Sequence, residues 1–277
     1  MALGYSTWGM PDVPIEEALP RLAAIGYAHV ELTVLPRYTT ALERLDAAAR
    51  VRLRELLRAT GLALPAVAGH TSLLAPDAAT HAAHFARLCA TADLCVDLAG
   101  DAPPVLNTTA GGRHEDDWEQ VRELLVERVG ALAEYCRQRG VILAIEPHVG
   151  SALSTPERTR WLIDNVGSPA LRVNFDISHF EAQGLPMDAS IPLLAPIAVH
   201  THLKDVRGRY PDFEFLLPGE GDFDYPRFFR RMREYGYAGE HTVEVSVMVQ
   251  RRTDYEPFAA AEFCYRAIAP HLAAAGG

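Results

Sequence analysis

The segment Val141–Gly150 reads VILAIEPHVG. Five apolar residues run directly into Glu146, after which Pro147 interrupts the run and His148 follows. An unbroken apolar run of this length is typical of a strand that is covered on both faces, as in a parallel sheet surrounded by helices. The sequence therefore predicts a buried parallel strand over 141–146 that ends in an acid.

Similar apolar runs alternate with amphipathic segments along the chain. Strands are predicted at residues 3–7, 28–34, 62–68, 104–109, 141–146, 171–176, 197–202 and 241–245. Helices are predicted at about residues 14–25, 40–60, 78–98, 116–139, 156–165, 187–195, 225–235 and 256–273. Eight strand–helix units without a linker indicate one α/β domain over residues 1–277, folded as a single (β/α)8 TIM barrel. A doubly wound sheet is the alternative, but the glycine-rich turn that it needs after its first strand is missing.

The composition limits the partners and the compartment. The 277 residues carry a formal net charge of −10, which repels phosphate backbones, so we expect no nucleic-acid partner. The four cysteines lack a metal-binding spacing, and we expect reduced thiols in a cytoplasmic protein. The sequence has neither a signal-peptide pattern nor an apolar run of about 18 residues, so we expect no membrane association.

Residues that commonly bind metal ions stand at the ends of four successive predicted strands. They are Glu146, Asp176, His202 and Glu244. Active sites of (β/α)8 barrels form where the carboxyl ends of the strands meet, so we expect these side chains to lie together. Three carboxylates at one rim repel one another unless a cation neutralises them. The donor set predicts one divalent ion, with Mn²⁺ first and Mg²⁺, Co²⁺ or Zn²⁺ as alternatives.

Each of these residues also has a simpler interpretation, because a single acid after a strand is often a helix cap. His148 shares a face with Glu146 if the strand continues, so it is either a general base or a residue that orients Glu146. His70 follows the third predicted strand and Asn107 lies on the fourth. We expect these two either to line the pocket and bind substrate or to be structural.

The segment after His202 supplies two further substrate-binding candidates, Lys204 and Arg207. Lys204 either binds a substrate oxygen or pairs with Asp205 or Glu244. Residues 205–224 show no clear periodicity, so they are predicted to form a long loop that closes over the site. Its aromatic residues either shield the substrate from water or pack the loop against the barrel; they are Phe213, Phe215 and Phe223.

Several motifs resemble the xylose-isomerase-like TIM-barrel superfamily over nearly the whole chain. They are AIEPH (144–148), NFDISH (174–179), HTHLKDV (200–206), LPGEGDFDY (217–225) and TVEV (242–245). That superfamily holds sugar isomerases and epimerases, inosose and dehydroshikimate dehydratases, and endonuclease IV. Similarity to its ketose 3-epimerases implies a metal held by the same four residues, with the two glutamates as acid and base. It also implies that His179 contacts the substrate.

The resemblance implies a metal-dependent isomerase or epimerase that removes an α-proton from a non-phosphorylated keto-sugar or cyclitol through a metal-bound enediolate. Two positions depart from the ketose 3-epimerases, which have a glutamate in place of Ala152 and an arginine in place of Gly208. A carbohydrate lyase with His148 as base therefore stays open, either a 3-oxo-glycoside deglycosidase or an inosose-type dehydratase.

Two more distant alternatives are an endonuclease IV-like repair enzyme and a non-catalytic sugar-binding subunit. The net negative charge opposes the first, and the complete set of ligand residues opposes the second. Barrels of the superfamily often form dimers or tetramers, and some work with a second subunit. Both a homo-oligomer and a hetero-oligomer therefore remain open, with a small carbohydrate as the expected ligand.

Overall fold

The computed structural model describes residues 2–113, 116 and 118–276. Eight parallel strands close into a barrel in the order β1-β10-β7-β6-β5-β4-β3-β2. Their bounds are β1 Leu3–Ser6, β2 His29–Thr33, β3 Ala63–Ala68, β4 Val105–Thr109, β5 Leu143–Glu146, β6 Leu171–Asp176, β7 Ala198–Leu203 and β10 His241–Val243. Every predicted barrel strand is present, within two residues of its predicted bounds. The predicted (β/α)8 fold is therefore confirmed.

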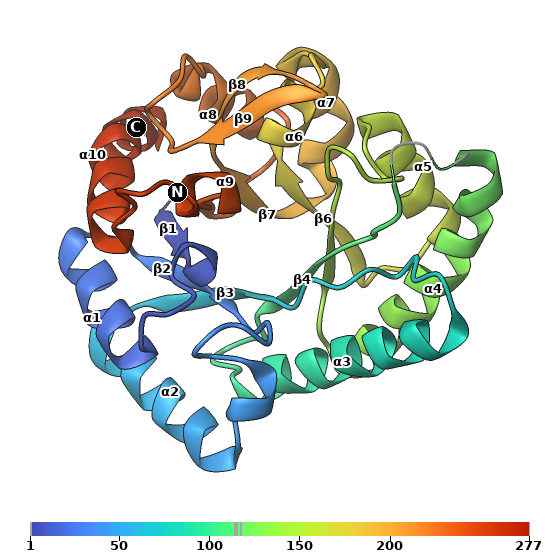
Figure 1. Cartoon of the computed structure of the whole chain (residues 1–277), viewed down its shortest axis with the longest axis horizontal. Helices are drawn as coiled ribbons and strands as arrows, with labels where there is room; N and C mark the ends of the chain where they lie inside the picture. Colours follow the sequence, from blue (N-terminus) through green and yellow to red (C-terminus); the bar gives the residue numbers. More distant parts are fainter. Residues whose placement is uncertain (1, 114–115, 117, 277) are drawn as a thin grey trace.

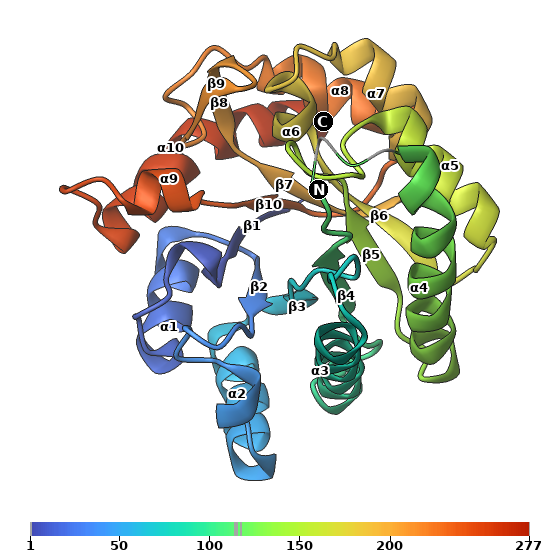
Figure 2. The same cartoon turned by 45° about the vertical axis from the view of Figure 1, so that its right-hand side comes forward.

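Helices surround the barrel (Figures 1 and 2). The longer ones are α1 Ile15–Ile25, α2 Ala47–Thr60, α3 Ala78–Asp97, α4 Trp118–Gln138, α5 Pro156–Val166, α7 Met187–Leu194, α8 Tyr225–Glu234 and α10 Pro257–Gly276. The short ones are η1 Thr7–Gly9, η2 Leu42–Arg44, α6 Ile177–Glu181, η3 Ala195–Ile197 and α9 Val247–Gln250. Thr155 caps α5 by accepting a hydrogen bond from the Arg158 amide, and Gly26 ends α1 with a φ of 117°. These local signals explain why most helix bounds were predictable. The helix predicted at 40–60 is an exception, because η2 occupies part of that range and α2 begins only at Ala47, after the N-cap Asp46.

The connection at residues 205–224 differs from its prediction. It contains two antiparallel strands, β8 Asp205–Arg209 and β9 Asp212–Leu216, that form a hairpin outside the barrel. Their pairing is local, with Val206 opposite Phe215 and Arg209 opposite Asp212. Strands this short leave only a weak period-2 signal, which explains why the sequence suggested an irregular loop.

The barrel strands separate apolar from polar side chains by their alternation. On β6, Val173 and Phe175 belong to the apolar core, while Asn174 approaches a histidine of the neighbouring strand inside the barrel. On β2, Val30 and Leu32 likewise join the apolar core on either side of the buried Glu31. The apolar core therefore lies between sheet and helices, and polar side chains fill the barrel interior.

Two composition-based expectations can be compared with this fold. All four cysteines are buried free thiols, as predicted; they are Cys89, Cys95, Cys136 and Cys264. Within the described part of the chain, no helix has both the length and the hydropathy that a membrane crossing requires.

Candidate metal centre and substrate pocket

The four predicted metal-binding residues lie together inside the barrel mouth. One donor atom from each of Glu146, Asp176, His202 and Glu244 lies within 4.8 Å of the others. His202 Nδ1 lies 3.1 Å from Glu146 Oε1 and 3.5 Å from Glu244 Oε1. All four residues are buried. The spacing of three carboxylate oxygens and one imidazole nitrogen allows a single divalent ion to contact all of them.

Strand register brings these residues to one level. Asp176 is paired with His202 across β6 and β7, and His202 is paired in turn with Thr242 of β10. Glu244 follows the last residue of β10, so it reaches the same rim. Asp176 also caps α6, because its Oδ1 accepts a hydrogen bond from the Ser178 amide at 2.9 Å. Capping and cluster membership thus use different oxygens of one carboxylate.

Lys204 lies against the same carboxylates. Its Nζ is 2.6 Å from Asp176 Oδ2 and also contacts Glu244 Oε2, so the predicted pairing with Glu244 is present. Burial alone would lower the pKa of Lys204, but Asp176, Glu244 and Glu146 outweigh it and raise that pKa. Burial likewise opposes a charged His202, yet the surrounding glutamates raise its pKa well above the ordinary value. Lys204 and His202 thus carry positive charge beside the same carboxylates that could hold a metal cation.

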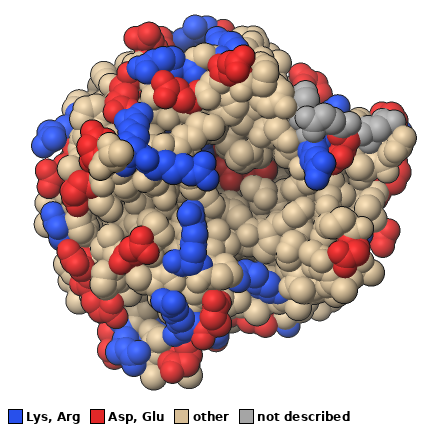
Figure 3. Space-filling view, viewed as in Figure 1, with Lys and Arg blue, Asp and Glu red and all other residues tan. Residues whose placement is uncertain are grey.

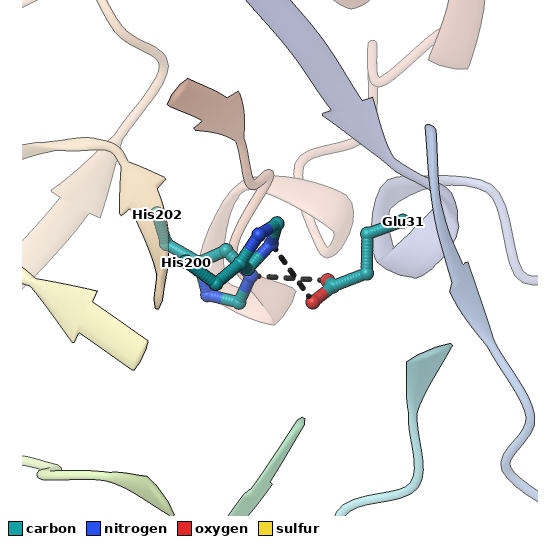
Figure 4. Close-up of side chains that lie close together, drawn as sticks. All are labelled: Glu31, His200 and His202. Carbon is teal, nitrogen blue, oxygen red and sulfur yellow. Dashed lines mark hydrogen bonds and ion pairs between the residues drawn. The ribbon is translucent and has the colours of Figure 1, made fainter. Parts of the chain in front are cut away.

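A fourth buried carboxylate, Glu31, lies against the opposite side of His202 (Figure 4). Glu31 Oε1 lies 3.0 Å from His202 Nε2, and Oε2 lies 3.2 Å from His200 Nε2. Ser6 Oγ donates to Oε1 at 2.6 Å, and Asn107 Nδ2 donates to Oε2 at 3.0 Å. With Nε2 directed at Glu31, Nδ1 is the nitrogen that faces the carboxylate cluster. A carboxylate on the far nitrogen of a ligand histidine is a common way to fix its orientation.

The sequence reasoning missed Glu31, although a signal was present. Glu31 stands inside the apolar run AHVELTV at residues 28–34, where an acid has no solvent-exposed face to occupy. The same contacts correct the prediction for Asn107. Its side chain is fully buried against Glu31 and is not among the residues that line the cavity, so Asn107 supports a buried carboxylate.

A cavity of about 530 Å³ opens above the carboxylate cluster. Figure 3 shows acidic atoms at the bottom of a central depression whose sides are mostly uncharged. Of the four clustered residues, Glu146 and Glu244 line this cavity, whereas Asp176 and His202 are fully enclosed beneath it. Two of the three clustered carboxylates therefore border the cavity, whereas Asp176 and His202 do not.

Three predicted histidines also line the cavity, close to the carboxylates. His70 Nε2 lies 3.9 Å from Glu146 Oε2, and His179 Nε2 lies 3.5 Å from Asp176 Oδ2. The ring of His148 packs on that of His179, with 3.8 Å between the ring centroids. Burial lowers the pKa of both His148 and His179, which favours neutral imidazoles able to accept a proton.

The hairpin places the remaining candidates differently. Arg207 extends into solvent and pairs with Glu214 at 2.7 Å, away from the residues that line the cavity. The reason is that β8 leaves the barrel, so its side chains no longer follow the inward alternation of β7. Phe213 and Phe215 line the cavity, whereas Phe223 packs against Tyr225 and lies outside it. Shielding of a substrate from water therefore remains an interpretation for Phe213 and Phe215, whereas packing is the interpretation that suits Phe223.

The sequence matches the family of xylose isomerase-like TIM barrels over residues 19–261. Because this match spans most of the chain, the protein belongs to that family. Its fold and its cluster of ligand-type residues agree with this assignment.

Curated relatives include a protein similar over its whole length and others similar over about half. The rhizopine catabolism protein MocC of Rhizobium meliloti is 28% identical, covering 100% of this chain and 89% of that protein. The inosose dehydratase of Clostridium perfringens (strain 13 / Type A) is 25% identical, covering 47% of this chain and 48% of the dehydratase. Similar proteins thus include a sugar-modifying dehydratase.

Solved structures show the same fold at low sequence identity. The IolI protein with a bound zinc atom superposes with a TM-score of 0.83 at 16% identity, covering 99% of both chains. D-psicose 3-epimerase with D-fructose superposes with a TM-score of 0.79 at 17% identity, covering 100% of both chains. The barrel of this chain is therefore shared with a zinc-binding protein and with a sugar epimerase.

Proposed function

We propose that the protein is a divalent-metal-dependent isomerase or epimerase of a non-phosphorylated keto-sugar or cyclitol. The proposal rests on the different positions of the four clustered residues relative to the cavity. Glu146 and Glu244 line the cavity, while Asp176 and His202 are enclosed beneath it. This arrangement suits an enzyme in which two carboxylates move protons of a substrate and all four residues hold an ion.

Glu146, Asp176, His202 and Glu244 would hold the metal, with Mn²⁺ as the expected ion and Mg²⁺, Co²⁺ or Zn²⁺ as alternatives. Such an ion supplies Lewis-acid polarisation of a carbonyl, which acidifies the neighbouring C–H bond. Glu31 holds the Nε2 side of His202 and leaves Nδ1 directed toward the carboxylates. We assign Glu31 the role of fixing this ligand before the ion binds.

The chain's own residues then account for the proton transfer. One of the two cavity-lining carboxylates, Glu146 or Glu244, accepts the α-proton, and the other returns a proton to the carbon. Return to the opposite face of the same carbon gives an epimer. Return to the former carbonyl carbon gives an isomer, provided that the hydroxyl proton of the first carbon passes to the other oxygen. We assign Lys204 and His179 to substrate oxygens, because both line the cavity beside these carboxylates. His70 closes the same side at 3.9 Å from Glu146.

Elimination is the second candidate, and the similarity to inosose dehydratases favours it. It begins with removal of the same α-proton, after which the C–O bond on the next carbon breaks. The hydroxyl or alkoxyl group takes up the proton that was removed and leaves as water or an alcohol. His148 would be the base in this case, because its ring lines the cavity and burial favours its neutral form. A neutral imidazole can take the proton, so that both glutamates would stay available to hold an ion.

One experiment tests the proposal and separates the two candidates. The Mn²⁺-loaded protein is incubated in D₂O with free ketoses, inososes and 3-oxo-glucosides, and the products are followed by NMR. Deuterium incorporation without loss of a group supports isomerisation or epimerisation, whereas release of water or an aglycone supports elimination. Absence of exchange with every compound would contradict both.

Two variants make this experiment specific. Glu244→Gln is expected to abolish exchange, because it removes both a metal ligand and a proton carrier. Glu214→Gln is the matched control, since Glu214 makes an exposed ion pair on the hairpin. His148→Ala separates the mechanisms: a preserved rate supports the two-glutamate scheme, and a lost rate supports His148 as the base.

A further inference from the structure

The ring of helices around the barrel is interrupted at one place. Neighbouring long helices pack against each other all round the ring except at α2 and α3, which touch only sparsely. Figure 2 shows these two helices standing apart. Their side chains meet where Arg50 pairs with Asp97 and Arg54 donates to the carbonyl oxygen of Asp97. The outer layer is therefore incomplete between α2 and α3.

The interruption uncovers the start of β3. Ala63 is exposed and Leu64 and Pro65 are only partly buried, whereas the second half of the strand is buried. Pairing of β3 with β4 begins at Ala66, after the uncovered part. An apolar strand segment without a helix over it leaves hydrophobic surface in contact with water, which is unfavourable until something covers it.

A groove of about 660 Å³ lies at this place and is called the α2–α3 groove below. Its lining comes from α2, from residues 61–65 and 98–102, and from Glu240. These residues precede or begin the strands β3, β4 and β10. The groove is therefore at the end of the barrel opposite the substrate cavity, and a molecule bound in it leaves that cavity open.

The α2–α3 groove combines apolar surface with charges of both signs. Arg58 of α2 and Asp101 are exposed, and Glu240 is partly buried. Among the residues that the structure describes, none forms an ion pair with any of these three side chains. Opposite charges that line one groove without pairing with each other are available to a second molecule.

The neighbouring helix surfaces add exposed apolar residues. Val51, Arg54 and Arg58 are spaced so that they share one stripe of α2. Val51 on α2 is 43% exposed and Val96 on α3 is 42% exposed, and these are the two most exposed large apolar residues of the described chain. Exposed apolar residues gathered on the two helices beside a groove are typical of a protein–protein contact.

We propose that the α2–α3 groove is the surface through which two copies of this chain associate about a twofold axis. A twofold axis applies one surface to itself, so every contact between two residues occurs twice. Arg58 of each copy then faces Asp101 and Glu240 of the other copy. A groove with both signs of charge fits a second copy of itself, whereas a wholly acidic or wholly basic partner would meet like charge in part of it.

The first test measures the mass of the full chain by analytical ultracentrifugation. Burial of the groove and of Val51 and Val96 in a twofold contact should give a dimer at roughly 10 µM. A chain that stays monomeric up to roughly 100 µM would overturn the proposal and leave the groove to a different partner.

Charge reversal tests the contact itself. Arg58→Glu places acids against acids, and the combined Asp101→Arg and Glu240→Arg protein places cations against cations. Each change acts twice in the dimer, so each should raise the dissociation constant by at least about ten-fold. An equimolar mixture of the two proteins should dimerise again, because an acidic groove then meets a basic one.

Arg52→Glu is the matched control on the same helix. Arg52 is exposed, does not line the groove and faces away from Arg54 around α2, so the same substitution should leave dimerisation unchanged. Circular dichroism checks that each variant is folded. A dimer that resists both charge reversals, or two reversed proteins that fail to associate when mixed, would overturn the proposed contact.

Discussion

The inner and outer faces of the barrel strands differ in chemistry although the same strands form both. Val30 and Leu32 of β2 join the apolar layer beneath the helices, while Glu31 between them contacts two imidazoles inside the barrel. On β7, His200 and His202 face Glu31, whereas Leu203 belongs to the apolar layer. Adjacent positions in the sequence thus serve the fold and the site separately.

Different interactions stabilise the two faces of the barrel strands. The outer layer stabilises the protein by roughly 25 cal/mol for each Å² of apolar surface that it buries, largely regardless of which apolar residue supplies it. Inside the barrel, each buried polar group is costly unless it is paired, and Glu31 is paired by Ser6, Asn107 and two histidines. We therefore expect inner substitutions to impair chemistry first and outer substitutions to impair stability first.

Among the substitutions that compare the two faces, the largest effect is expected for Glu146→Gln on the inner face. Loss of a proton carrier should lower the rate of α-proton exchange by about 10²–10⁴-fold, while the helices and the apolar layer remain folded. Deuterium incorporation by NMR measures the rate, and circular dichroism checks the fold. A Glu146→Gln protein that exchanges at the unaltered rate would remove Glu146 from the site.

On the outer face, Leu32→Ala should lower the free energy of unfolding by about 2–5 kcal/mol, because it leaves a cavity beneath the helices. Urea unfolding measures this change. The folded fraction should bind as much Mn²⁺ per chain as the unaltered protein. If Leu32→Ala reduced metal binding without reducing stability, the expectation that outer-face residues of β2 serve stability and not the site would be contradicted.

The neighbouring change Glu31→Gln sharpens the same comparison. An amide cannot accept hydrogen bonds from both imidazoles through both of its terminal atoms, so His202 should be held less firmly. We expect Mn²⁺ affinity to fall by about 10–100-fold, measured by competition with a chelator. Leu32→Ala serves as the adjacent control, and equal metal affinity in both variants would contradict the role assigned to Glu31.

The smallest effect is expected for Arg207→Ala, which lies on neither face of the barrel. Its exposed ion pair with Glu214 should contribute less than about 1 kcal/mol to stability. The exchange rate and the KM for a ketone substrate should also be unchanged. A raised KM in this variant would instead return Arg207 to the substrate-binding residues.

Most of the fold could be predicted from sequence because its signals are local. Apolar runs identify the strands, and caps such as Thr155 and Gly26 identify helix ends. The grouping of Glu146 with Asp176 was also predictable, since the carboxyl ends of consecutive parallel strands share one rim. The hairpin at 205–216 was missed because its strands are too short to give a clear period.

The less predictable features depend on contacts between distant segments. Asn107 and Arg207 are both polar residues near predicted strand ends, yet Asn107 is buried against Glu31 and Arg207 lies in solvent. His148 was expected to continue the strand face of Glu146. β5 ends at Glu146, yet His148 still lines the cavity beside Glu146, with its ring packed on that of His179.

The sequence by itself determined the eight-stranded barrel and the four ligand-type residues, because alternation, caps and strand ends are properties of short segments. Only the tertiary structure decided that Glu31 holds His202 and that Phe213 and Met248 line one cavity. These residues are far apart in the chain, and closure of the barrel brings them together. The sequence specifies each side chain, but the packed barrel specifies its partners.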